Sequence, residues 1–310
     1  MQNLIIDTDA GVDDAIAIMM ALAHPHTKIR AITTVNGNVD VDKVTINAAL
    51  VLDQYDADIP IYRGNDRPLI AETMNSAEIH GGDGLGDSVA DLPPTERTPE
   101  SEHAALALIR LAKKYAGNLT LLALGPLTNI AMAIRLDSSF PEYVSRLVVM
   151  GGAIDARGNV TPAAEFNIYA DAEAAAIVFD AGFRDLSLLS WETTMAYPMS
   201  WSEFDDIAGV KSERGKFYNR ITAQIAGLMK DGFGAPGFLL PDPLAAAVAL
   251  QPDLVDDAPH VSVRVEISGE QGRGLTSVDW NQQFGGSPNA FVVRKLDDQQ
   301  VFAMIRAAVK

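Results

Sequence analysis

The segment Leu4-Ile-Ile-Asp-Thr-Asp-Ala-Gly-Val-Asp-Asp-Ala15 is the most informative part of this chain. Its apolar run, Leu4–Ile6, stops at Asp7, and a helical pattern of apolar residues runs from Asp13 to Ala23. Asp13 and Asp14 would then lie in the first helical turn, where the helix dipole favours negative charge. The segment therefore predicts a buried strand, a sharp turn and an amphipathic helix.

Four aspartates, Asp7, Asp9, Asp13 and Asp14, are crowded into this one turn. Crowded like charges raise the pKa of some of the carboxyls unless a cation lies between them. Carboxylate oxygen suits Ca2+ or Mg2+ far better than zinc or copper. Because a solvated acidic surface would not directly follow a buried strand, the sequence predicts a divalent cation site at this turn.

The composition limits the possible classes of function. The chain has 310 residues, is 48% hydrophobic and carries a net charge of -17 from 24 basic and 41 acidic residues. It is long enough to bury a large core, and its negative charge argues against nucleic acid or an anionic membrane surface as a partner. The absence of cysteine excludes disulfides, thiolate nucleophiles and cysteine-ligated zinc. No apolar run is long enough to span a membrane and no basic signal-peptide region precedes Leu4, so we expect a cytoplasmic protein.

Apolar runs typical of strands alternate with helical patterns as far as Leu189. The expected strands are Leu4–Ile6, Ile29–Val35, Leu119–Leu124, Leu147–Met150 and Leu186–Leu189. The expected helices are Asp13–Ala23, Val41–Asp53, Glu102–Tyr115, Leu127–Arg135 and Ala172–Asp180. This alternation predicts an α/β fold: an open, mainly parallel sheet flanked by helices on both faces.

The rhythm changes in the last third of the chain. We expect a long helix over Glu213–Lys230, a Gly/Pro-rich segment over Gly232–Pro243 and a helix over Pro243–Leu250. Strands near Val261–Ile267, Leu275–Asp279 and Phe291–Arg294 and a C-terminal helix follow. Without repeats or a low-complexity linker, residues 1–310 are interpreted as one domain with a C-terminal helical and β elaboration.

Polar residues that packing does not explain follow the carboxyl ends of the expected strands, where ligands bind in open α/β sheets. They lie in five segments: Asp7–Asp9, Asn36–Asn38, Gly125–Asn129, Gly151–Gly152 and Gly158–Asn167. Each alone is compatible with a plain turn, a helix cap or a solvated loop. Asp242, between Pro241 and Pro243, is compatible with an N-cap aspartate followed by proline at the first helical position. Together at one edge of a sheet, the segments predict a site.

The same segments resemble, in order, the signature loops of the nucleoside hydrolases, calcium-dependent enzymes that cleave purine and pyrimidine ribonucleosides. The matching stretches are Asp7-Thr-Asp-Ala-Gly-Val-Asp-Asp-Ala15, Thr33-Thr-Val-Asn-Gly-Asn38, Ile79-His-Gly-Gly-Asp-Gly-Leu-Gly86, Ala123-Leu-Gly-Pro-Leu-Thr-Asn129, Gly158-Asn-Val-Thr-Pro-Ala-Ala-Glu-Phe-Asn167 and Asp242-Pro-Leu-Ala245. The resemblance implies hydrolysis of the N-glycosidic bond to free base and ribose in purine and pyrimidine salvage, by a homodimer or homotetramer.

The resemblance also implies the roles of individual residues. Ca2+ would be held by Asp9, Asp14, Asp242 and the backbone carbonyl of Leu124. Asp9 would be the base that activates a Ca2+-bound water, in a reaction whose transition state resembles an oxocarbenium ion. The ribose would be bound by Asp13, Asn38, Asn159, Glu165, Asn167 and Asp242.

One position departs from the family pattern. Branches of the family carry a histidine or a tryptophan directly before the aspartate that matches Asp242, whereas this chain carries Pro241. Proline can neither donate a proton to the leaving base nor stack on it as an indole does. His80, followed by the glycines of Gly81–Gly86, is the candidate substitute as proton donor. The alternative for His80 is a loop histidine that contacts solvent or substrate only.

Two other functions stay open from the sequence. A nucleoside-binding protein would keep the ribose site but have lost turnover through Pro241. A Mg2+-dependent phosphohydrolase would use Asp7 as nucleophile and Asp9 as acid and base, although that pattern gives no place to the Asp13-Asp14 pair or to Glu165 and Asn167.

Overall fold

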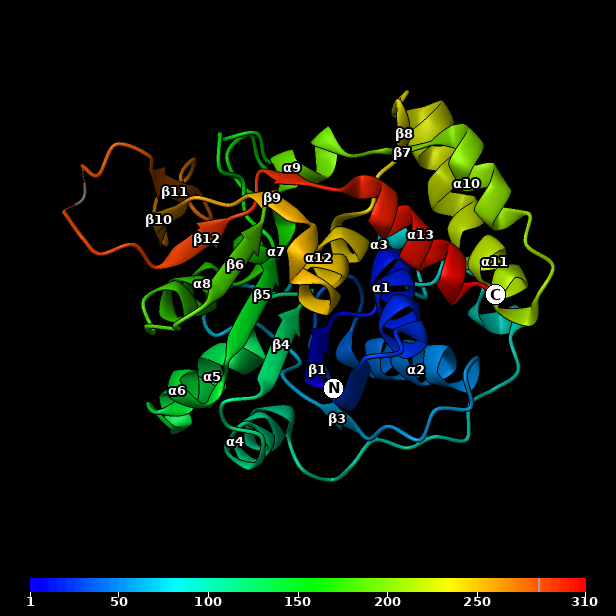
Figure 1. Ribbon diagram of the computed structural model, residues 1–310, viewed down its shortest axis with the longest axis horizontal. Coiled ribbons are helices and arrows are strands. Elements are labelled where there is room, and N and C mark those ends of the chain that lie inside the picture. Colours follow the sequence, from blue (N-terminus) through cyan, green and yellow to red (C-terminus); the bar gives the residue numbers. More distant parts are fainter. Residues whose placement is uncertain (284) are drawn as a thin grey trace.

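The computed structural model describes residues 1–283 and 285–310 as an α/β fold around a nine-stranded sheet of order β11-β10-β12-β6-β5-β4-β1-β2-β3 (Figure 1). Neighbouring strands are parallel except that β10 runs antiparallel to both β11 and β12. The strands are β1 (Gln2–Thr8), β2 (Thr27–Thr34), β3 (Ile61–Arg63), β4 (Leu119–Ala123), β5 (Arg146–Met150), β6 (Leu186–Leu189), β10 (His260–Val265), β11 (Thr276–Asp279) and β12 (Ala290–Val292). The expected open, mainly parallel sheet is confirmed.

Alternate residues of the central strands enter two separate cores. In β1, Leu4 and Ile6 face one core while Ile5 faces the other, because successive strand side chains point to opposite faces. Both faces are therefore covered, as a parallel sheet requires. Each fully buried side chain of this kind contributes about 1.5–3 kcal/mol.

The helices divide between the two faces (Figure 1). The core on the Leu4 side is closed by α1 (Val12–Ala23), α2 (Val41–Asp53), α10 (Trp201–Ala208), α11 (Glu213–Gly227), α12 (Pro241–Leu250) and α13 (Asp298–Ala308). The core on the Ile5 side is closed by α4 (Ala104–Lys114), α5 (Thr128–Leu136), α6 (Phe140–Tyr143) and α8 (Ala172–Phe179). Helices α1 and α12 pack against each other, which brings distant parts of the chain together.

Short elements complete the fold. They are α3 (Ala77–His80), η1 (Val89–Asp91), α7 (Phe166–Ala170), α9 (Trp191–Ala196), β7 (Met199–Ser200), η2 (Leu228–Gly232), β8 (Gly237–Phe238), η3 (Pro252–Leu254), β9 (Val255–Asp257) and β13 (Lys295–Leu296). Two small sheets pair β7 with β8 and β9 with β13. No helix in the described parts of the chain has both the length and the apolar character of a membrane span.

Two expectations for the C-terminal third need correction. The long helix ends at Gly227 and continues as the π-helical turn η2, so Lys230 lies outside regular α-helix. Helix α12 begins at Pro241, two residues before the expected start. Because a proline at the first helical position has no N–H to leave unpaired, Pro241 starts the helix, and Asp242 is its second residue rather than its N-cap.

Candidate active site

The turn between β1 and α1 is built around Asp14. Its Oδ2 accepts a hydrogen bond from the Gly11 N–H at 2.9 Å, and its Oδ1 accepts one from the Thr8 hydroxyl. Asp14 thus ties the end of the strand to the start of the helix. Asp13, the preceding residue, projects from the same helical turn and accepts no hydrogen bond at Oδ1 within the described part of the chain.

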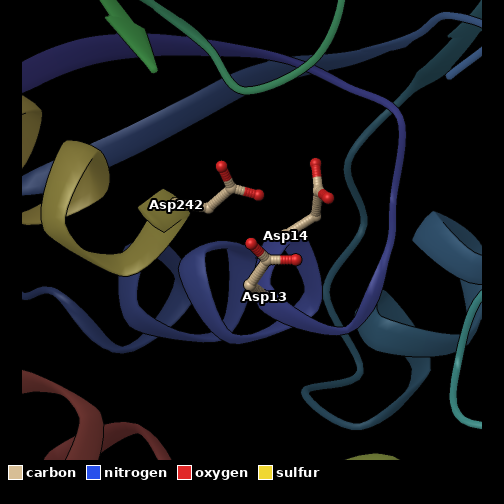
Figure 2. A group of neighbouring side chains, drawn as sticks. All are labelled: Asp13, Asp14 and Asp242. Atoms are coloured by element: carbon tan, nitrogen blue, oxygen red, sulfur yellow. The ribbon is translucent and has the colours of Figure 1, made fainter. Parts of the chain in front are cut away.

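Asp242 completes a group of three carboxylates. Asp13 and Asp14 rise from the first turn of α1 and Asp242 from the start of α12, and all three face a common region (Figure 2). Each offers one carboxylate oxygen within 4.8 Å of the other two. All three residues are buried, at 9%, 0% and 3% exposure.

Asp9 lies beside this group in a space that two glycines leave open. A Cβ at Gly37 would fall 2.0 Å from Asp9 Oδ2, and one at Gly125 would fall 2.8 Å from Asp9 Oδ1. Oδ2 accepts a hydrogen bond from the Asn38 N–H at 2.8 Å, whereas Oδ1 has no partner among the described residues. In the loops after β2 and β4, glycine backbone therefore lies directly against Asp9, where a side chain would not fit.

Burial raises the pKa of the carboxyls in this cluster. Burial, followed by the charges of Asp14 and Asp13, raises the pKa of Asp9 well above its usual value, although the Asn38 N–H opposes the shift. Burial and the charges of Asp13, Asp14 and Asp9 raise the pKa of Asp242 in the same way. Burial raises the pKa of Asp13 to about 6 despite nearby backbone N–H groups. Buried carboxylates in mutual contact are stable in ionised form only with a compensating cation.

His80 does not supply that cation. It ends α3, is 8% exposed and lies with Nδ1 3.7 Å from Asp13 Oδ1. Nδ1 accepts a hydrogen bond from the Val12 N–H at 3.2 Å, which leaves the ring proton on Nε2. Burial lowers the pKa of His80 to about 4, against the opposing charge of Asp14, so the imidazole is neutral near pH 7. His80 is therefore not a loop histidine that contacts solvent only.

The residues of the cluster fit a hard divalent cation. The donors are all carboxylate oxygens, and buried Asp9 Oδ1 and Asp13 Oδ1 lack partners in the described residues. The expected fourth ligand, the Leu124 carbonyl, follows β4 and accepts a hydrogen bond from Asn167 Nδ2 at 2.6 Å. The structure groups Asp13 with Asp14 and Asp242 most closely, with Asp9 beside them.

Glu165 and Asn167 form a buried wall rather than a solvated loop. Glu165 caps α7 and accepts the N–H groups of Gly152, Asn167 and Ile168 at 2.9, 2.9 and 3.2 Å. Burial raises its pKa to about 7; these N–H groups oppose the shift and the charge of Asp13 adds to it. Asn167 donates to both Leu124 and Met150, so α7 is anchored to the ends of β4 and β5.

Of the two remaining predicted residues, Asn38 contacts the carboxylate cluster and Asn159 lies in an exposed loop. Asn38 is joined to the cluster, because its Nδ2 donates to Asp14 Oδ2 at 3.1 Å and its Oδ1 accepts from Ser76 Oγ at 2.5 Å. Asn159 is exposed and its Oδ1 accepts the Phe166 N–H at 2.9 Å. The structure therefore leaves Asn159 in the loop rather than among the buried groups.

Sequence reasoning did not identify two supporting residues. Asn129 donates to Asp7 Oδ2 at 2.9 Å and to the Thr34 carbonyl at 3.0 Å, which links β1, β2 and α5. Its place in the Gly125–Asn129 segment was a usable signal. Ser76, which holds Asn38, has no distinguishing neighbours in the sequence and could be found only from the structure.

The fold defines the class. The structure superposes on a plant nucleoside hydrolase, the PpNRh1 enzyme, with a TM-score of 0.92, 32% identity and coverage of 99% of this chain and 98% of the other. An inosine-guanosine nucleoside hydrolase gives a TM-score of 0.92, 34% identity and coverage of 100% and 99%. The fold is thus that of the nucleoside hydrolases.

The sequence comparisons identify the family. The model of the inosine-uridine preferring nucleoside hydrolases matches residues 4–303. Uridine nucleosidase 1 of Arabidopsis thaliana is 38% identical over 86% of this chain and 79% of its own length. The non-specific ribonucleoside hydrolase RihC of Escherichia fergusonii is 35% identical over 95% and 93%. The chain belongs to the inosine-uridine preferring nucleoside hydrolase family.

Proposed function

We propose that this protein is a Ca2+-dependent nucleoside N-ribohydrolase that cleaves ribonucleosides to free base and ribose. The supporting observation is the buried cluster of Asp9, Asp13, Asp14 and Asp242, whose unpartnered oxygens call for a cation, in a chain of this family. The resemblance further leads us to propose a cytoplasmic homodimer or homotetramer acting in nucleobase salvage.

Asp9, Asp14, Asp242 and the Leu124 carbonyl are the proposed Ca2+ ligands. When bound, the cation would supply Lewis-acid chemistry, holding the ribose diol and making water more acidic. Ca2+ is proposed over Mg2+ because it accepts carboxylate and carbonyl oxygens in flexible geometry, whereas Mg2+ retains much of its water.

The residues of the chain act on the sugar and the water. Asp9, with one oxygen fixed by Asn38 and the other unpartnered, takes the proton of the attacking water. The surrounding carboxylates stabilise the positive charge that develops on the ribosyl carbon. Hydroxyls of the ribose are bound by Asp13, Asn38, Asn159, Glu165, Asn167 and Asp242.

The leaving base is assigned to His80. Because Nδ1 is engaged by Val12, Nε2–H is the group free to donate to the base. As a neutral donor His80 would stabilise the charge that develops on the base through a hydrogen bond from Nε2–H. The ring would keep this proton, since its loss would leave an imidazolate beside the aspartates, and the released base takes its proton from water. Pro241 contributes the start of α12 and no polar side chain.

Pro241 also favours a second candidate, a nucleoside-binding protein with weak or no turnover. Tight binding of a ribonucleoside without release of base over hours would select it. The Mg2+-dependent phosphohydrolase has less support, because its nucleophile, Asp7, is fully buried and bonded to Thr33 and Asn129.

The deciding experiment is a panel of inosine, uridine, cytidine and adenosine with their 2′-deoxy counterparts, assayed with Ca2+ and with EDTA. We expect base release from ribonucleosides only, and loss of release in EDTA. Turnover that is indifferent to EDTA, or equal for deoxy substrates, would contradict the proposed role of the cation and the diol.

A further inference from the structure

The loop between β5 and α7 forms one border of the site. It follows Gly152, includes the exposed Asn159 and ends at Glu165, the buried cap of α7. An antiparallel bridge from Ala164 to Leu275 holds its far end against the strand region near β11. Its near end, residues 153–158, is bonded to helix α9.

Glu192 provides these bonds from outside the loop. Its Oε2 accepts the Ile154 N–H at 2.9 Å, and its Oε1 accepts the Asp155 and Arg157 N–H groups at 2.9 and 3.3 Å. Ala156, with φ of 55°, turns the backbone so that the flanking N–H groups converge. Such a concave set of N–H groups binds anions, and here the anion is a side chain of the same protein.

A second connection joins α9 to Glu165, beside the contacts of the Glu192 side chain. The N–H of Trp191, the residue before Glu192, donates to the Gly152 carbonyl at 2.9 Å. The Gly152 N–H in turn donates to Glu165 Oε2 at 2.9 Å. Helix α9, the loop and Glu165 are therefore one continuous hydrogen-bonded unit.

We propose that Glu192 is a positioning residue that holds residues 153–158 closed and so keeps Asn159 and Glu165 in place for the ribose. This inference rests on the proposed function, since both residues are placed there as ribose ligands. Its effect is expected on substrate binding rather than on the chemical step, because within the described residues the Glu192 side chain bonds to the loop alone.

The test compares Glu192→Gln and Glu192→Ala with the wild type, all as Ca2+-loaded full-length protein. Glutamine keeps the size but presents an NH2 group to N–H donors, so at least one bond is lost. We expect KM for a ribonucleoside to rise about tenfold with kcat changed less than about threefold. Trypsin should cut after Arg157 about tenfold faster than in the wild type, since cleavage follows the population of the open loop.

Glu203→Gln is the matched control. Like Glu192, Glu203 is an acidic residue in the first turn of its helix, α10, but it bonds to Ser200 and not to the loop. It should leave both KM and cleavage at Arg157 unchanged. If Glu192→Gln leaves both quantities at wild-type values, or matches Glu203→Gln in both, Glu192 only stabilises its helix and the inference is wrong.

The two proposals fail separately. A wild type that hydrolyses no ribonucleoside contradicts the proposed function, and trypsin cleavage still decides whether Glu192 holds the loop. An active wild type with an unaltered Glu192→Gln variant contradicts the inference alone.

Discussion

The carboxylates at the floor of the site differ from those in its walls. At the floor, Asp9 and Asp13 are buried and each has an oxygen without a hydrogen-bond partner in the described residues. In the walls, by which we mean the loop and α9 beside Glu165 and the glycine loop after His80, Glu165, Glu192 and Asp83 each accept three backbone N–H groups. The number of hydrogen bonds that a carboxylate accepts therefore distinguishes the carboxylates that could hold a cation from those that hold backbone.

The difference has a physical origin. A carboxylate that accepts several backbone N–H groups has part of its charge compensated by them, so it fixes the backbone and is costly to remove for structural reasons. A buried carboxylate left unsaturated retains its attraction for a cation or for charge that develops during a reaction. We therefore expect floor variants to lose catalysis with the fold intact, and wall variants to lose binding.

Asp9→Asn tests the floor and should have the largest effect. Asparagine can still accept from Asn38, so the fold should persist while the base and a cation ligand are lost. We expect kcat to fall by about 10^3-fold or more, with a circular dichroism spectrum like that of the wild type. Turnover close to normal would remove Asp9 from the mechanism.

His80 lies beside Asp13 of the floor and directly precedes the glycine loop of the wall. Its variants should have the next largest effect. His80→Ala and His80→Asn both remove Nε2–H, but the asparagine oxygen can still accept from Val12. We expect about 10- to 100-fold slower hydrolysis of ribonucleosides with poor leaving bases, and little change with p-nitrophenyl riboside, whose leaving group needs no proton. Equal slowing of both substrates would show that His80 is not the donor.

The pH dependence of stability should reveal the buried carboxyls of the floor, with a contribution of the same sign from Glu165, whose pKa burial raises to about 7. Burial raises the pKa of Asp13 to about 6, so the metal-free folded state binds a proton more tightly than the unfolded chain, where an aspartate has a pKa of about 4. Stability from this group is complete below about pH 4 and is lost as the pH rises through about 6.

The measurement is Tm in EDTA and in Ca2+ at about pH 5 and about pH 7.5. In EDTA we expect Tm to be lower at the higher pH by about 5 °C or more. Ca2+ should reduce the difference, because the cation compensates the ionised carboxylates. Equal Tm values at both pH values in EDTA would contradict the proposed strain at the floor.

Asp83→Asn tests a wall and should have the smallest effect. Asp83 accepts the N–H groups of Leu85, Asp87 and Val89 in the glycine loop after His80. We expect kcat/KM to fall by less than about tenfold, mainly through KM. A loss as large as that of Asp9→Asn would break the distinction between floor and walls.

Local patterns predicted the regular elements well. Helix α2 and strand β6 have the expected bounds, because each has a strong periodic pattern between clear breakers. The start of α12 was misplaced because two prolines flank Asp242, and either could take the first helical position. The clustering of strand-end loops followed from topology, since parallel strands place their carboxyl ends at one edge.

The sequence alone did not predict the surroundings of individual side chains. The burial of His80 depends on Val12 and on helix α11, which packs against α3 from far along the chain. The loop that carries the exposed Asn159 is bonded at Ile154 to Glu192, which is distant in sequence. Such pairings are set by tertiary packing, which a local pattern does not encode.

The glycines around Asp9 make the protein intolerant at positions that carry no reactive group. Because a Cβ at residue 37 or 125 would fall 2.0 or 2.8 Å from an Asp9 carboxylate oxygen, an alanine there would displace the side chain of Asp9. At these two positions, tolerance to substitution is set by the space beside Asp9 and not by any reactive group of the residue replaced.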